Sequence, residues 1–175
     1  MPRYLRSRVP GGTYFFTVAL ADRSSELLVA NIGDLRDAYV AVQRRRPFET
    51  VAVCILPEHL HALWTLPPDD VNYASRWQQI KRTFSLRCEA GPRSASQEAK
   101  REKGVWQRRY WEHQIRDARD LARHIDYIHF NPVKHGHVQQ VRDWPHSSFH
   151  RWVARGDLPP EWGLVQAPGS TAFGE

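Results

Sequence analysis

The sequence predicts an α+β fold, a ferredoxin-like βαββαβ sandwich built on an antiparallel sheet, with an additional C-terminal helix. Three observations support this prediction. Segments rich in β-branched and aromatic residues alternate with segments of helical periodicity, in the order strand, helix, strand, strand, helix, strand. Only two residues separate the second and third strands, which indicates a hairpin. A further helical segment follows the fourth strand, so the ferredoxin-like pattern carries one addition.

The first half of the pattern is a strand, a helix and the hairpin. Residues 14–20 are aromatic and β-branched, which predicts the first strand. Residues 32–45 carry apolar side chains at spacings of three and four, as on one face of an amphipathic helix, and end in arginines that suit the negative end of a helix dipole. Residues 48–56 and 59–66 predict the two strands of the hairpin.

The next segment is predicted to be a basic helix followed by a loop. The helix is expected over residues 71–88, and Asp69 or Asp70 can cap its first turn. Residues 89–104 are polar and mixed in charge, without an apolar period. They are therefore expected to form a mobile loop.

The last strand and the additional helix complete the pattern. Residues 106–115 alternate weakly and predict the fourth strand, and residues 117–130 predict the helix. Pro132 disfavours helical geometry at the residue before it, so the helix is expected to end at Asn131.

Length and composition predict a single domain over residues 1–163. With 175 residues, of which 41% are hydrophobic, the chain is long enough to bury one core. Residues 1–12 are expected to form a basic arm and residues 164–175 a disordered tail. Cys54 and Cys88 stand in apolar patterns, which favours buried thiols in a reducing compartment over a disulfide.

The chain is basic and offers no membrane-spanning segment. Its 25 Lys and Arg residues against 19 Asp and Glu give a net charge of +6 and a pI near 9.7. This charge attracts polyanions, although a basic protein need not bind nucleic acid. No run is long and apolar enough to cross a bilayer, and no apolar block of a secretory signal follows the first residues. We therefore expect a cytoplasmic protein.

Two histidines in the third strand are candidate metal ligands. Residues two apart in a strand point to the same face, so His59 and His61 are expected to project in parallel, with Leu63 beyond them. Two neutral imidazoles on a stiff strand make half of a divalent-metal site. The alternative is that both face solvent or form hydrogen bonds within the sheet.

The last helix carries polar residues that match this pair. His124, Tyr127 and Asn131 fall at spacings of three and four, to one side of the apolar stripe. If this side lies against His59 and His61, the Asn131 oxygen completes a metal site and Tyr127 reaches a phosphate bound there. Alternatively, Tyr127 flanks the core with its hydroxyl in a hydrogen bond, and Asn131 is a turn residue.

These residue types suit cleavage of a phosphodiester. A divalent ion acts as a Lewis acid on a non-bridging phosphate oxygen. A tyrosine can then attack the phosphorus and form a covalent phosphotyrosine. Three ligands of mixed nitrogen and oxygen type favour Mg²⁺ or Mn²⁺ over a closed zinc site.

The motifs resemble those of the HUH single-tyrosine transposases, and within them the REP-associated tyrosine transposases of bacteria. The resemblance extends over about residues 3 to 152. It rests on Pro-Glu-His-Leu-His at 57–61 and on Tyr-x-x-x-Asn-Pro-Val-Lys-x-Gly at 127–136. Trp-Gln-Arg-Arg-Tyr at 106–110 and Trp-Pro-x-Ser-Ser at 144–148 add to it.

The resemblance implies an enzyme that cleaves single-stranded or hairpin DNA and rejoins strands through a 5′-phosphotyrosine, leaving a free 3′-hydroxyl. It implies that His59 and His61 bind the metal with Asn131 as third ligand, and that Tyr127 is the nucleophile. Relatives often have Gln at the position of Asn131 and Asn at that of Glu58. The location implied is the bacterial cytoplasm with its nucleoid, and the choice between monomer and homodimer stays open.

Basic residues supply candidate DNA contacts, and exposed aromatics can stack on unpaired bases. Two other function classes fit the same sequence: a metal-dependent phosphodiesterase that uses water, and a nucleic-acid-binding module without catalysis. Activity that survives Tyr127→Phe would indicate the first, and DNA binding without any metal requirement the second. The candidate DNA contacts are Arg3, Arg6, Arg8, Lys81, Arg82, Arg108, Arg109 and Lys134.

Overall fold

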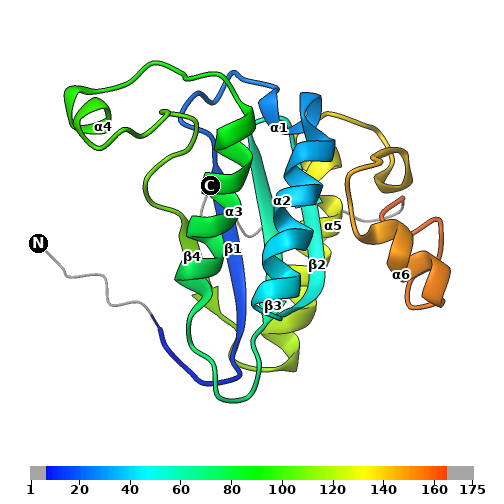
Figure 1. Cartoon of the computed structure of the whole chain (residues 1–175). Helices are drawn as coiled ribbons and strands as arrows, with labels where there is room; N and C mark the ends of the chain where they lie inside the picture. Colours follow the sequence, from blue (N-terminus) through cyan, green and yellow to red (C-terminus); the bar gives the residue numbers. More distant parts are fainter. Residues whose placement is uncertain (1–6, 165–175) are drawn as a thin grey trace, which may run out of the picture.

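The computed structural model describes residues 7–164 as four strands, six α-helices and one short 3-10 helix (Figure 1). The predicted arm therefore lies partly, and the predicted tail almost wholly, outside the described residues. The strands are β1 (Thr13–Ala19), β2 (Glu49–Ile55), β3 (His59–Thr65) and β4 (Trp111–Gln114). The helices are α1 (Leu27–Ala30), α2 (Ile32–Arg45), α3 (Tyr73–Arg87), α4 (Ala95–Ala99), α5 (Ala118–Lys134), η1 (Val141–Asp143) and α6 (Phe149–Arg155).

The four strands form one antiparallel sheet in the order β2-β3-β1-β4. This is the order of the ferredoxin-like pattern, and it confirms the predicted fold class. β3 is a central strand, paired with β1 on one side and β2 on the other. The pairing of β1 with β3 sets Thr17 opposite His61 and Ala19 opposite His59.

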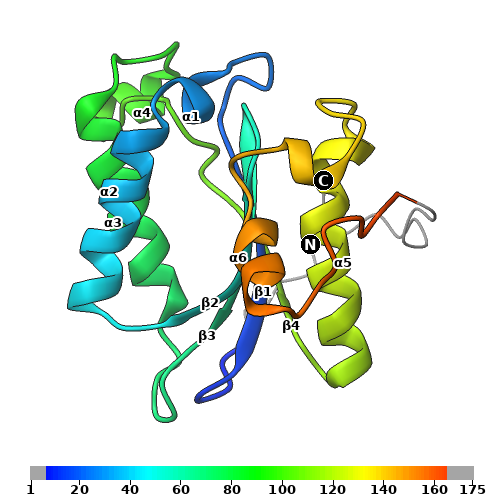
Figure 2. The same cartoon turned by 90° about the vertical axis from the view of Figure 1, so that its right-hand side faces the viewer.

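Helices cover both faces of the sheet (Figure 2). On the face covered by α2 and α3, Trp64 of β3 stacks on Trp77 of α3, with ring centroids 4.2 Å apart. On the other face, Phe15 and Leu63 pack with Ile128 of α5 in a second, smaller cluster. Because its side chains are buried on both faces, β3 holds the residues it carries in fixed positions.

The predicted start of α3 was wrong in its capping residue. Asn72 caps the helix, and its side chain accepts a hydrogen bond from the Ser75 backbone N–H. Asp70 lies two residues before this cap. Its carboxylate accepts a hydrogen bond from the Asn72 N–H and pairs with Arg76, whose Nη2 is 2.7 Å from the Asp70 Oδ2. The carboxylate thus stabilises the turn before the helix.

Residues 89–104 are not a plain loop. They contain α4, which begins with a capping box in which Ser94 and Gln97 satisfy each other's backbone N–H groups. The fourth strand is also shorter than predicted, because β4 spans only Trp111–Gln114. Trp106 contributes an isolated bridge to Leu20 instead.

The additional helix continues past the proline that was predicted to end it. Pro132 lies inside α5, which reaches Lys134. Proline removes one backbone donor and disfavours helical geometry before it, at a cost of about 3 kcal/mol in a helix interior. Here the turn is retained by the His135 N–H, which donates to the Asn131 carbonyl, and by burial of Asn131 and Pro132.

The segment after α5 covers the β2 edge of the sheet. The Ile55 N–H donates to the His146 carbonyl, and the Ser148 N–H donates to the Val53 carbonyl. The Trp144 indole N–H also donates to the Ile55 carbonyl. These contacts pack the segment against β2. Both cysteines are buried and unpaired as predicted, and none of the described helices is long and apolar enough to span a membrane.

Candidate active site

His59 and His61 project from β3 toward α5, on the same side as Leu63. Both side chains are fully buried, and their ring centroids lie 4.8 Å apart. The strand alternation predicted this shared direction, and the structure confirms it. The alternative that both face solvent is wrong, whereas a hydrogen bond within the sheet, the other form of that alternative, is present between His61 and Thr17 of β1.

Each imidazole is held at its Nδ1 atom by a neighbouring side chain. The His59 Nδ1 lies 2.8 Å from the Glu58 Oε1, and the His61 Nδ1 lies 2.9 Å from the Thr17 Oγ1. A metal at this pair would therefore be bound through Nε2. Burial lowers the pKa of His59, against the attraction of the Glu58 carboxylate. The neutral imidazole that results is the form that binds metals.

Tyr127 lies beside this pair. Its ring meets the His61 ring edge-on, with centroids 5.2 Å apart, and it also contacts Phe15 at 6.0 Å. The Lys134 ammonium lies 3.5 Å from the phenol oxygen and 4.9 Å from the ring centroid. A phenol, a cation and an imidazole thus meet on one side of the sheet.

Asn131 is positioned between the two histidine contacts of α5. Tyr127, four residues earlier, lies against His61, and His135, four residues later, has its ring centroid 5.1 Å from that of His59. Residues four apart share a helix face, so Asn131 faces the same side. Its side chain is fully buried, and neither its oxygen nor its nitrogen has a hydrogen-bond partner within residues 7–164.

This arrangement fits a divalent cation. A buried amide without hydrogen bonds is costly, and so is the buried His59 Nε2, which likewise has no hydrogen-bond partner among the described residues. Two imidazoles and an amide oxygen form a mixed donor set that suits a divalent ion. A cation bound here would give the His59 Nε2 and the Asn131 side-chain oxygen a partner that the described residues do not supply.

A second polar cluster ties β4 to the first turns of α5. His113 Nε2 lies 2.8 Å from Asp120 Oδ2, and His124 Nδ1 lies 2.8 Å from the Asp120 carbonyl. Within the described chain, these three side chains are the one group of three histidine, cysteine or acidic residues whose donor atoms all lie within 4.8 Å. The sequence predicted that His124 lies on the same side of the helix as Tyr127. In the structure its Nδ1 contacts Asp120.

The predicted DNA contacts are spread over both faces of the molecule. Lys134 lies next to Tyr127, with its ammonium 3.5 Å from the phenol oxygen. Lys81 and Arg82 belong to α3, on the opposite face of the sheet, and the Lys81 ammonium donates to the Gln107 carbonyl. Arg8, Arg82, Arg108 and Arg109 are all exposed, and Arg108 also pairs with Glu102. Arg3 and Arg6 lie outside the described residues.

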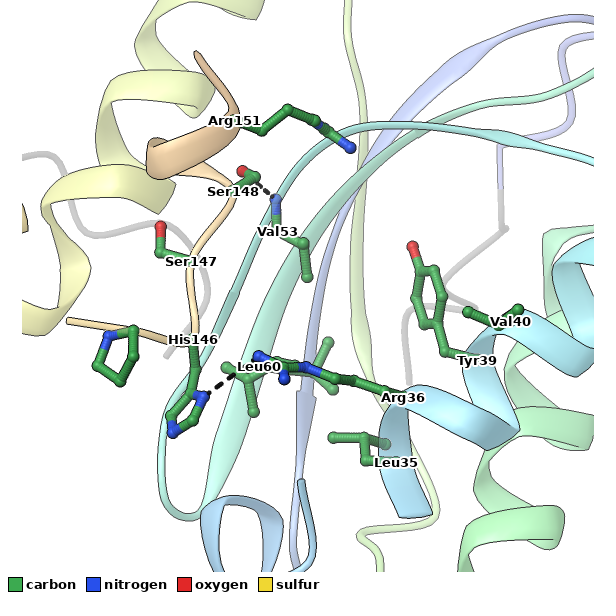
Figure 3. A pocket seen from close by; sticks show the side chains of 12 residues that line it. Leu35, Arg36, Tyr39, Val40, Val53, Leu60, His146, Ser147, Ser148 and Arg151 are labelled. Carbon is green, nitrogen blue, oxygen red and sulfur yellow. Dashed lines mark hydrogen bonds between the residues drawn. The ribbon is translucent and has the colours of Figure 1, made fainter. Parts of the chain in front are cut away.

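A pocket of about 210 Å³ opens elsewhere, between α2 and the segment that covers the β2 edge (Figure 3). Leu35, Tyr39 and Leu60 line it together with Arg36 and His146. Leu60 points to the face of β3 opposite the histidines. The pocket is therefore separate from the histidine and tyrosine site.

Two curated proteins resemble the chain over most of its length. One, from Escherichia coli strain K12, is a REP-associated tyrosine transposase, 48% identical over 162 residues, which cover 93% of this chain and 91% of that protein. The other, from Haemophilus influenzae, carries the same family description and is 49% identical over 165 residues, covering 93% and 94%. The chain belongs to the REP-associated tyrosine transposases. They are DNA-cleaving and DNA-joining enzymes, which confirms the predicted enzyme class.

A solved structure agrees with this membership. It is a REP-associated tyrosine transposase bound to a REP hairpin, with a TM-score of 0.86 and 46% identity, and the match covers 100% of this chain and 98% of that one. No family model matches the chain. The family assignment thus rests on whole-chain similarity as well as on the motifs.

Sequence reasoning left several residues of the site without a role. Thr17 is 44 residues from His61 in the chain, and only the pairing of β1 with β3 brings the two together. No sequence feature predicted the contact of His135 with His59, because His135 simply follows the segment predicted as the additional helix. Glu58 stood out as a departure from relatives, but its contact with His59 was not predicted.

Proposed function

We propose that the chain is a metal-dependent single-stranded DNA endonuclease and strand transferase that acts on hairpin DNA from repeats through a 5′-phosphotyrosine. The observation that carries this proposal is the contact of the Tyr127 ring with His61, at 5.2 Å between centroids. The relative of known structure is bound to a REP hairpin, which supports a DNA hairpin as partner.

His59, His61 and Asn131 are the residues that would hold the cation, Mg²⁺ or Mn²⁺. Bound there, the ion would draw negative charge from a non-bridging oxygen of the scissile phosphate. The protein's part is to keep the three donors in place. Burial on both sides of β3 fixes the imidazoles, and the last turn of α5 fixes the amide.

Tyr127 performs the covalent step. Its oxygen attacks the phosphorus as the bond from phosphorus to the 3′ oxygen breaks, so one phosphodiester is exchanged for another. The phenol loses its proton, and the departing 3′ oxygen gains one, which leaves a 3′-hydroxyl. In the rejoining step a 3′-hydroxyl attacks the phosphotyrosine, and the phenol is restored.

Lys134 supports this step from the same helix. Its ammonium lies 3.5 Å from the Tyr127 oxygen, at a distance where a cation stabilises negative charge on that atom. The same charge attracts the phosphate that the tyrosine attacks. Lys134 is therefore both a partner of the nucleophile and a phosphate contact.

The remaining DNA contacts are assigned by exposure. Arg8, Arg82 and Arg109 are exposed, and we assign them to phosphates outside the catalytic centre. Lys81 and Arg108 already make contacts within the protein, which gives them a structural role besides any contact with DNA.

A denaturing gel with end-labelled hairpin oligonucleotides tests the proposal. Wild type with Mg²⁺ or Mn²⁺ should nick the DNA and remain attached to one product. His61→Ala should bind the hairpin without nicking it. Nicking by Tyr127→Phe at the wild-type rate would indicate a phosphodiesterase that uses water. Hairpin binding without any nicking by wild type would indicate a binding module.

A further inference from the structure

Glu58 lies in the turn between β2 and β3, directly before His59. Its Oε1 lies 2.8 Å from the His59 Nδ1, and the Arg23 Nη2 lies 3.6 Å from the same oxygen. The Glu58 carbonyl accepts a hydrogen bond from the Leu20 N–H, which fixes the backbone of the turn to the end of β1. The carboxylate is thus held against the imidazole from two sides.

We propose that Glu58 is a positioning residue that directs the His59 Nε2 toward the metal. This inference rests on the proposed function. The two ring nitrogens point to different sides of the imidazole, so a carboxylate at Nδ1 is not placed to ligate an ion at Nε2. Its effect acts through the ring that it holds. Carboxylates that accept from the second nitrogen of a metal-binding histidine fix its orientation and raise its basicity.

The two histidines differ in how firmly their tautomer is set. A carboxylate only accepts hydrogen bonds, so the contact with Glu58 requires a proton on the His59 Nδ1 and leaves a lone pair on Nε2. A hydroxyl can donate or accept, so the contact of His61 with Thr17 allows either tautomer. Glu58 therefore makes His59 the ligand whose lone pair is fixed before the metal binds.

Direct titration of full-length protein with Mn²⁺ tests this role without any DNA. Electron paramagnetic resonance of the free ion measures the dissociation constant for wild type, Glu58→Ala, Glu58→Gln and His61→Ala. A matched control is Asp34→Ala, which removes a carboxylate from a surface ion pair with Arg87. Any binding retained by His61→Ala is assigned to other sites, such as the cluster around Asp120, and subtracted.

We expect Glu58→Ala to weaken Mn²⁺ binding by about 10-fold to 100-fold. Glu58→Gln, which keeps an accepting oxygen, should lose less, and Asp34→Ala should bind as wild type does. Long-range ¹H–¹⁵N spectra of the histidines should show the Nδ1–H tautomer of His59 in wild type and a mixture in Glu58→Ala. A purely structural role would lower the melting temperature and leave both readouts unchanged.

The outcomes separate this inference from the proposed function. Wild-type binding that is lost in His61→Ala but unchanged in Glu58→Ala and Glu58→Gln would overturn the role of Glu58 and leave the metal site intact. An equal loss in Asp34→Ala would also overturn it, because general charge would then explain the effect. If wild type and His61→Ala bind Mn²⁺ equally, the metal-dependent function fails, and the role of Glu58 fails with it.

Discussion

The Tyr127 ring lies edge-on against the His61 ring, with their centroids 5.2 Å apart. The two residues are 66 positions apart in the chain, on different elements, and meet because α5 packs on the face of β3 that carries the histidines. A phenol and a buried imidazole pair in contact are the parts that a tyrosine-dependent cleavage of DNA requires.

Replacement of Asn131 by leucine should abolish cleavage and stabilise the protein. The buried amide has no hydrogen-bond partner within the described residues, so its removal relieves a desolvation cost of roughly 1–3 kcal/mol. We expect the free energy of unfolding in urea to rise by about 1 kcal/mol. Asn72→Ala, which removes the cap of α3, should instead lower it by about 1 kcal/mol and leave cleavage intact. Destabilisation by Asn131→Leu would contradict a ligand role for this amide.

Replacement of Lys134 by methionine should slow cleavage more than it weakens binding. The ammonium lies 3.5 Å from the Tyr127 oxygen, and in the proposed reaction its loss removes a cation next to the charge that develops there. At saturating hairpin DNA the single-turnover rate should fall at least about 10-fold, or about 1.4 kcal/mol in the barrier. The slope of the logarithm of the binding constant against the logarithm of the salt concentration should become smaller by about 1, as expected for the loss of one phosphate contact. Lys134→Arg should retain much of the rate, and Lys100→Met, an exposed charge on the α4 segment, should retain all of it.

Stability should fall in mild acid because of His129. Burial lowers its pKa to about 3, and its ring is completely buried beside Ser148. The unfolded chain binds a proton near pH 6.5 and the folded chain does not, so stability is full above that pH and declines as pH falls toward 3. This group alone contributes about 1.4 kcal/mol per pH unit in that window.

Urea unfolding of wild type and His129→Gln between pH 7.5 and 5.0 checks the sign and the source. The variant should lose less stability than wild type over this range, because glutamine does not titrate. Other buried histidines affect both proteins equally, so they cancel in the comparison. Parallel losses in the two proteins would show that His129 does not carry the effect.

Strand alternation predicted the site better than any other sequence feature. Side chains alternate between the two faces of a strand, and a shift of one residue would move every side chain to the other face. Because β3 is buried on both faces, His59 and His61 share one side of the sheet. The helical period of residues 124–131 likewise predicted that Tyr127 and Asn131 share a face of α5. Which partners hold the imidazoles was not predictable, because Thr17 reaches His61 only through the register of β1 with β3.

Local rules failed where tertiary packing opposed them. A proline disfavours helical geometry at the residue before it. Asn131 precedes Pro132 and is nevertheless helical, because its turn is buried against the sheet. The charge of the basic residues gave no information on which face they occupy. Lys81 and Lys134 have the same chemistry, but one lies on α3 and the other on α5, on opposite sides of the sheet.

Peptide mapping of the covalent product tests the central claim most directly. After reaction with hairpin DNA and nuclease trimming, trypsin should release residues 124–134, in which Tyr127 is the only tyrosine. Mass spectrometry should find the nucleotide on this peptide, attached to that residue. A nucleotide on a different peptide, or full cleavage without any covalent product, would contradict the assignment of Tyr127 as the nucleophile.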